Sequence, residues 1–304
     1  MNYSHITRDF FREPFYNFRM WKPTEIAIPF FALMIAVEIY LSVRYEENYD
    51  RRDVWTNIAL GFGSSVFGII FGLATSFFYL WIYENAAPYK MPLNVWWSWA
   101  ILLVADDFLY YWFHRISHEV RFFWNFHVVH HSSNQYNLSV AVRQSWFSGV
   151  AHWIFYLPAA FLGFPLWAFV TMHGLNLIYQ FWIHTKTIKK MPAWFEYIFN
   201  TPSHHRVHHG VNDEYLDKNY GGIFIIFDRL FGSFIEENKK VRYGIIKPIQ
   251  SYNWLWINTH GWAETFEAMK ARKTFYGKLR CLFGAPAMDF EEKVLLTTNI
   301  NKQI

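Results

Sequence analysis

The sequence predicts an all-α protein with several membrane-crossing helices and a histidine-rich, two-metal helical cap on one face. The first observation is composition: of 304 residues, 53% are hydrophobic and 22% aromatic, and such an aromatic share favours a membrane protein. The second is that long apolar segments alternate with polar, basic ones. The third is that 12 of the 14 histidines fall between residues 114 and 209.

The apolar segments are long enough to cross a bilayer, which takes roughly 20 mostly apolar residues. They span residues 26–43, 54–83, 95–113 and 147–184. The last one is interrupted at residues 163–165 and predicts a hairpin of two helices that enters and leaves on one side. Lysines and arginines gather beside the later segments, and the positive-inside rule therefore predicts a cytoplasmic active site. The number of crossings stays open.

This interpretation divides the chain into three expected parts. Residues 1–94 are expected to hold an N-terminal interfacial segment and membrane helices. Residues 95–250 are expected to form the catalytic domain, with one membrane helix, the histidine clusters and the hairpin. Residues 251–304 are expected to form a polar helical tail.

Charge and cysteine content exclude several classes of protein. A net charge of +4 without a dense lysine and arginine block argues against a nucleic-acid partner. Cys281 is the one cysteine, so the chain has neither an internal disulfide nor a thiolate cluster. Any bound metal must therefore rely on histidines and carboxylates.

The histidines follow a helical spacing. Residues three or four apart lie on one face of a helix, so the pair in HRISH, the three in HVVHH and those in HHRVHH are each expected to converge. The candidate metal ligands are His114, His118, His127, His130, His131, His204, His205, His208 and His209, with His184 after the hairpin. The other four histidines are expected to be ordinary hydrogen-bonded side chains.

So many neutral imidazoles together indicate bound cations. Imidazole suits zinc, copper, iron and nickel. One metal takes about four to six ligands, so nine or ten histidines indicate two metals. A dinuclear iron centre for oxygen chemistry is favoured over a two-zinc hydrolase, which more often adds carboxylates. The spacing alone does not separate iron from zinc.

The order of the histidine motifs resembles the fatty acid hydroxylase superfamily, which includes sterol desaturases. The stretches YYWFHRISHE, HHSSNQYNLSVAVRQS, YQFWIHT, NTPSHHRVHHG and DKNYGGIFIIFDRLFGSF are most similar to the alkylglycerol monooxygenase branch. These words cover about residues 110–235.

The resemblance implies an integral-membrane, oxygen-dependent lipid monooxygenase that binds two iron ions. The histidines named above would be its ligands, with His204 the least certain, and Gln180 would hydrogen-bond a ligand or a water. The branch further implies cleavage of ether lipids, with tetrahydropterin as a possible reductant. An electron-donor protein is an equal alternative.

Several polar residues are candidates for supporting roles. Asp106, Asp107 and Glu119 are the carboxylates nearest to the first histidine motif, and metal-bound histidine usually donates its second N–H to a carboxylate or carbonyl. Asn137, Arg143 and Gln144 are expected to orient a substrate head group or to hydrogen-bond at the interface.

Alternative functions remain at this point. The same chemistry would also serve a sterol or fatty-acyl hydroxylase or desaturase. A haem-binding electron-transfer protein would use a few paired histidines. A two-zinc hydrolase or a noncatalytic metal-binding protein would bind metal without using oxygen.

Overall fold

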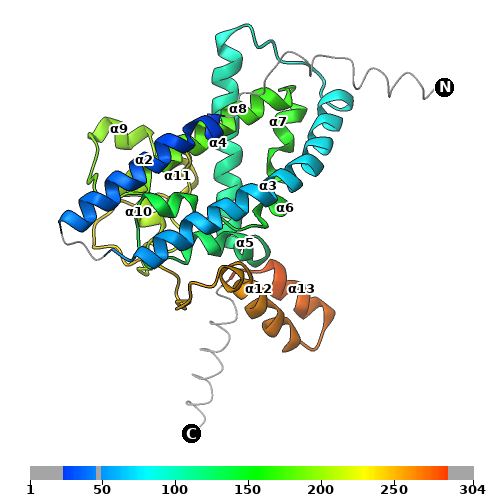
Figure 1. Cartoon of the computed structure of the whole chain (residues 1–304). Helices are drawn as coiled ribbons and strands as arrows, with labels where there is room; N and C mark the ends of the chain where they lie inside the picture. The colour runs from blue at the N-terminus through cyan, green and yellow to red at the C-terminus, as the bar shows by residue number, and fades with distance from the viewer. Residues whose placement is uncertain (1–22, 46–48, 287–304) are drawn as a thin grey trace.

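The computed structural model describes residues 23–45 and 49–286, and no β-strand forms within these ranges. The predicted all-α class is therefore confirmed for this part of the chain (Figure 1). The interfacial segment predicted for the N-terminus lies outside the described residues.

Two helices, α2 (Pro23–Arg44) and α3 (Arg51–Asn85), are long and apolar enough to cross a membrane, by length and composition. Their apolar side chains face outward: Phe62 is 73% exposed and Leu73 is 75% exposed. A core helix of a soluble protein would bury these groups, because exposing each large apolar side chain to water costs roughly 1.5–3 kcal/mol. The outward apolar surface therefore supports a lipid environment for both helices.

Helix α4 (Trp96–Glu119) runs through the middle of the fold and brings its last turns to the histidine-rich region (Figure 1). It packs against α5 (Arg121–His131) and α8 (Leu166–Ile183). The chain changes direction at Val120, whose backbone is extended. The end of α4 and the whole of α5 therefore form one angled pair.

The apolar region 147–184 differs from a simple hairpin of two helices. Its first arm is divided into α6 (Ser148–Ala151), the 3₁₀ helix η2 (Trp153–Tyr156) and α7 (Leu157–Phe161), and only its second arm, α8, is one continuous helix. Pro158 lies at the start of α7, because proline lacks the amide hydrogen that a helix interior requires. The turn between the arms needs Gly163, which has φ +88° and whose Cβ would lie 1.9 Å from the carbonyl oxygen of Tyr89.

A cap of short elements covers the polar end of α4. It contains the 3₁₀ helix η1 (Leu138–Val142) and the helices α9 (Ala193–Ile198), α10 (Pro202–His208) and α11 (Ile226–Phe231). Helix α10 begins at Pro202 after Thr201, and proline is favoured at the first position of a helix.

The C-terminal helices lie beyond α5, at the bottom of the view in Figure 1. Helix α12 (Trp254–Lys270) packs against α5, and α13 (Phe275–Phe283) packs against both. Ile257 of α12 is fully buried with Leu60 of α3 and Val129 of α5. Helices α12 and α13 are thus anchored to α5, which carries three of the histidines.

Candidate metal centre

The ends of four helices bring the histidines together. His114 and His118 lie on the last turns of α4, and α5 carries three more in its last turn and a half. His184 is the residue after α8, and His209 is the residue after α10. Because each helix ends at the cap, its final side chains point into one shared volume.

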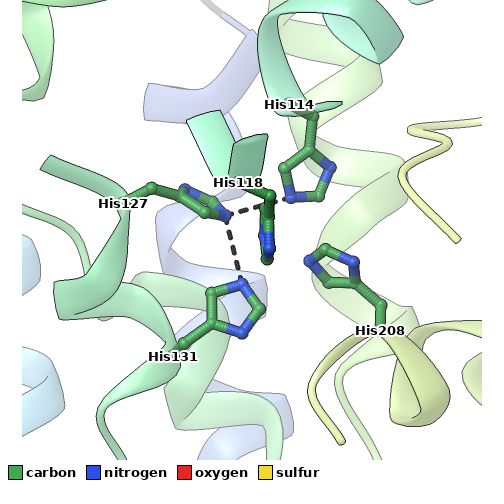
Figure 2. Close-up of side chains that lie close together, drawn as sticks. All are labelled: His114, His118, His127, His131 and His208. Atoms are coloured by element: carbon green, nitrogen blue, oxygen red, sulfur yellow. Dashed lines mark hydrogen bonds between the residues drawn. The ribbon is translucent and has the colours of Figure 1, made fainter. Parts of the chain in front are cut away.

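The structure sorts nine of the ten candidate histidines into two compact groups. Within each group, one nitrogen from every ring lies within 4.8 Å of those of the others. The five-histidine group contains His114, His118, His127, His131 and His208, and Figure 2 shows these rings turned toward a common centre. The four-histidine group contains His130, His184, His205 and His209.

Two of the sequence motifs are shared between the groups. On α5, His127 and His131 join one group while His130 joins the other. On α10 and the residue after it, His208 joins the five-histidine group and His205 the four-histidine group. The rings of His131 and His209 stack across the boundary with centroids 4.3 Å apart. The two groups are therefore neighbours, as a dinuclear centre requires.

Main-chain carbonyls fix how four of the rings are oriented. The Nδ1 atom of His114 lies 2.8 Å from the carbonyl oxygen of Tyr220, and that of His208 lies 2.9 Å from that of Lys218. In the other group, Nδ1 of His130 meets the Arg143 carbonyl at 3.1 Å, and Nδ1 of His184 meets the Gln180 carbonyl at 2.7 Å. A carbonyl only accepts, so each Nδ1 carries the proton and each Nε2 keeps a lone pair.

Those lone pairs face one another inside the groups. Nε2 of His184 lies 3.2 Å from Nε2 of His130 and 2.9 Å from Nε2 of His205. Since His130 and His184 both hold their proton on Nδ1, no hydrogen is available between their Nε2 atoms. The buried Nε2 atoms of His118, His208 and His209 have no hydrogen-bond partner. A cation in each group would satisfy these lone pairs, so the residues present fit two metal ions.

Burial keeps the rings in the form that binds a metal. Desolvation, followed by repulsion from neighbouring histidines, holds the pKa of His127, His131, His205 and His209 well below the usual value. Burial lowers the pKa of His130 to about 4. The rings are therefore neutral at physiological pH and their lone pairs are free for coordination.

One short segment orients three rings of the five-histidine group. We call residues 217–221 the strap. Its carbonyls at Lys218 and Tyr220 take the two Nδ1–H groups described above, and the carboxylate of Asp217 lies 3.4 Å from Nδ1 of His118. Asp217 and Asn219 both have φ of 57°, a left-handed conformation that aspartate and asparagine tolerate better than most residues.

Two buried carboxylates hold the strap and its continuation. Asp228 of α11 accepts hydrogen bonds from the amides of Tyr220 and Gly221, both at 2.7 Å. Asp107 of α4 accepts from the amides of Ile223 at 2.6 Å and Phe224 at 2.8 Å. Asp107 therefore acts on the backbone beside the strap and does not contact a histidine directly. Sequence reasoning missed Asp228, although an acid inside the apolar stretch IFIIFDRLF is a signal for a buried carboxylate.

The other predicted supporting residues have different surroundings. Asp106 accepts from Nδ1 of His173 at 3.0 Å and from Asn176 at 2.9 Å, about two turns before His114 on α4. The Gln180 side chain donates to Asn176 at 2.7 Å, while its carbonyl orients His184. The Glu119 side chain is 47% exposed and pairs with Arg115 on the same helix at 2.8 Å.

His204 is the one candidate ligand that the structure does not bring to either group. Its Nε2 atom lies 3.9 Å from Glu196, and its ring packs edge-on against Phe234. Spacing alone would place His204 on the same helix face as His208, so its separation comes from its contacts with Glu196 and Phe234 and not from helical geometry.

Arg143 stabilises the backbone that orients His130 of the four-histidine group. Its guanidinium is buried and donates to Asn57 at 2.7 Å, to Ser132 at 2.8 Å and to the carbonyl of Val129 at 2.8 Å. Burial lowers the pKa of Arg143 to about 10. These bonds tie α3 and α5 to the backbone whose carbonyl orients His130. The guanidinium is thus enclosed by protein groups.

A helical protein with two adjacent, buried, all-histidine groups beside apolar helices belongs to the class of membrane-associated metalloproteins. The particular family follows from comparison: residues 99–233 match the model of the fatty acid hydroxylase family. The chain therefore carries a fatty acid hydroxylase domain, and the recognition made from the histidine motifs is confirmed. All nine grouped histidines lie within the matched residues.

The chain is similar to curated members of one branch over most of its length. It is 39% identical to human alkylglycerol monooxygenase over 262 residues, which are 86% of this chain and 58% of the human protein. It is 41% identical to the zebrafish (Danio rerio) alkylglycerol monooxygenase over 228 residues, 74% of this chain and 51% of that protein. Ornithine lipid hydroxylase OlsE of Rhizobium tropici is 30% identical over 142 residues, 43% of this chain and 40% of its own.

The chain thus spans somewhat more than half the length of the alkylglycerol monooxygenases that it matches. No solved structure matches it.

Proposed function

We propose that this protein is an oxygen-dependent lipid monooxygenase of the membrane, which binds two iron ions and cleaves the ether bond of alkylglycerols. The observation that carries the proposal is the pair of all-histidine groups with inward lone pairs. The similarity to alkylglycerol monooxygenases at 39–41% identity supports the choice of substrate.

Nine histidines would hold the metals. The five-histidine group would bind one iron and the four-histidine group the other, leaving His204 outside the ligand set. Iron in these groups would supply the ability to activate dioxygen and to insert one oxygen atom into a C–H bond. Two electrons and two protons are also consumed, and the second oxygen atom leaves as water. A tetrahydropterin is the proposed reductant, and a donor protein is the alternative.

Hydroxylation at the carbon beside the ether oxygen gives a hemiacetal. The hemiacetal collapses to a fatty aldehyde and a free glycerol hydroxyl, so the ether bond breaks without a separate hydrolytic site. What the chain itself contributes is position: the backbone carbonyls and the two buried carboxylates hold the rings in a fixed geometry, and burial keeps water away from them.

The other parts of the proposal concern placement. We infer that α2, α3, the apolar part of α4 and the arms of residues 147–184 cross or enter the bilayer, with the cap in the cytoplasm. Residues 1–94 would then be the membrane-entry part, residues 95–250 the catalytic part, and residues 251–304 a tail on the cytoplasmic side.

Two alternatives fit the geometry less well. A haem needs a flat space between its axial ligands, whereas ring nitrogens here lie 2.9–3.2 Å from one another. A two-zinc hydrolase usually adds carboxylate ligands, and neither group contains one. A sterol or fatty-acyl hydroxylase or desaturase remains the alternative within the same chemistry.

The test is release of fatty aldehyde from an alkylglycerol by membranes that contain the protein. The reaction is run with and without oxygen and with and without tetrahydropterin. We expect aldehyde only when both are present, and none from His131→Ala. The matched control is His204→Gln, which should keep its metal and its activity. Iron-loaded wild-type protein that releases no aldehyde would refute ether cleavage, and zinc in place of iron would refute the monooxygenase.

A further inference from the structure

Helix α13 has an exposed apolar stripe that the metal site does not explain. Phe275 is 76% exposed, Tyr276 is 74%, Leu279 is 38% and Phe283 is 54%. At 3.6 residues per turn, these positions fall on one face of the helix. The opposite face is packed, because Cys281 is 1% exposed. The helix therefore buries one side in the protein and shows a second apolar side outward.

Basic residues border this stripe. Lys278 and Arg280 are exposed on α13 and lie on either side of the apolar positions around the helix. The wider segment 270–286 contains five basic residues and no acidic one, Lys270, Arg272, Lys273, Lys278 and Arg280. An apolar face with flanking lysine and arginine is the pattern of a helix that lies in the interface of a membrane.

The position of α13 fits the same reading. The amide of Arg121, just after the end of α4, donates to the carbonyl of Gly284 at 2.9 Å. Helix α13 therefore lies where the apolar length of α4 has ended and the cap begins, at the bottom of Figure 1.

A chain of aromatic rings joins the stripe to the apolar surface of the membrane helices. Phe283 contacts Phe122 with centroids 5.8 Å apart, Phe122 contacts Phe123 at 5.1 Å, and Phe123 contacts Phe155 at 5.3 Å. Beyond Phe155, Ile154 is 53% exposed and lines an apolar groove with residues of α3 and α7. Contacting aromatic rings thus connect α13 with the apolar groove beside α3 and α7.

We propose that α13 lies in the surface of the membrane that contains α2 and α3, with its stripe among the lipids and its basic residues on anionic head groups. The partner that the stripe binds is therefore the surface of an anionic phospholipid membrane. This contact would give the cap a second attachment besides the spanning helices, and would hold α12 and α5 at a fixed height above the bilayer.

The full chain in lipid nanodiscs tests this inference with a single fluorescent label. The native Cys281 is buried, so it should not react, and unmodified protein measures any background. Leu279→Cys carries the label in the stripe. Glu267→Cys is the matched control on α12, whose side chain is 72% exposed. Lipids with a quencher in the acyl chain and iodide in the water report the surroundings of each label.

We expect the label at position 279 to be quenched by the lipid and not by iodide, and the label at position 267 to show the reverse. In nanodiscs with anionic lipid, changing Lys278 and Arg280 to glutamine should lower the ratio of membrane-bound to unbound α13 by about fivefold for each charge removed. Quenching of position 279 by iodide alone overturns the inference. Protection from both quenchers also overturns it, because protein would then cover the stripe, either a second copy or residues 287–304.

Discussion

Replacing Asp228 by alanine should release the strap and empty the five-histidine group selectively. Asp228 accepts hydrogen bonds from the amides of Tyr220 and Gly221 and from the hydroxyl of Ser233, each at 2.7 Å. Alanine leaves two buried amides without an acceptor, and each costs about 1–3 kcal/mol, so the cap should lose about 2–6 kcal/mol of stability. Tyr220 then no longer presents its carbonyl to His114.

The effect on metal is the more specific readout. Loss of a hydrogen bond that orients a metal-bound histidine typically lowers metal affinity about 10–100-fold. The assay is metal per chain during dialysis against increasing chelator. Wild type should retain two ions, whereas Asp228→Ala should lose one early and keep the ion of the four-histidine group. Asp228→Asn keeps one oxygen acceptor and should fall between them. Loss of both ions together, or retention of both as in wild type, would contradict the role given to the strap.

Further predictions concern the buried network, the backbone and pH. Arg143→Lys keeps the charge but loses the planar set of donors, and should cost about 2 kcal/mol, measured as a lower melting temperature with earlier loss of metal from the four-histidine group. Gly222→Ala places a Cβ atom 2.5 Å from Oδ1 of Asp107, so Asp107 must move away from the amides whose hydrogen bonds it accepts. We expect this variant of the protein to have a lower melting temperature. An unchanged melting temperature would show that this carboxylate is dispensable for stability. Burial lowers the pKa of both His130 and His204 to about 4, while unfolded histidine takes up a proton near 6.5. The unfolded state therefore binds more protons between these values, and the stability of metal-free protein should fall as pH drops from about 6.5 toward 4, by up to about 3 kcal/mol for each group. The melting temperature of the metal-free protein at pH 7 and at pH 5 tests this, and His204→Gln should reduce the difference between the two. In a separate measurement of metal per chain, the same variant should still bind two ions. Loss of one ion in that variant would show that His204 is a ligand.

Most of the metal centre could be predicted from the sequence. Spacings of three and four residues place side chains on one face of a helix whatever surrounds it, so His114 with His118 and His205 with His208 were predicted to converge. The number of histidines indicated two metals because one metal accepts only a few ligands. Helical class and the two long apolar helices also follow from local pattern, since bilayer thickness sets segment length.

The tertiary structure alone decided how these histidines are divided between the two groups and what orients them. His127 and His130 are three residues apart on α5, yet they belong to different groups, because His127 meets His114 of α4 whereas His130 meets His184, the residue after α8. Asp107 and Asp228 lie more than 100 residues apart in sequence but hold the same loop through its amides. Every residue except proline carries the same amide and carbonyl groups. Their use therefore depends on backbone conformation and packing, which residue types do not specify.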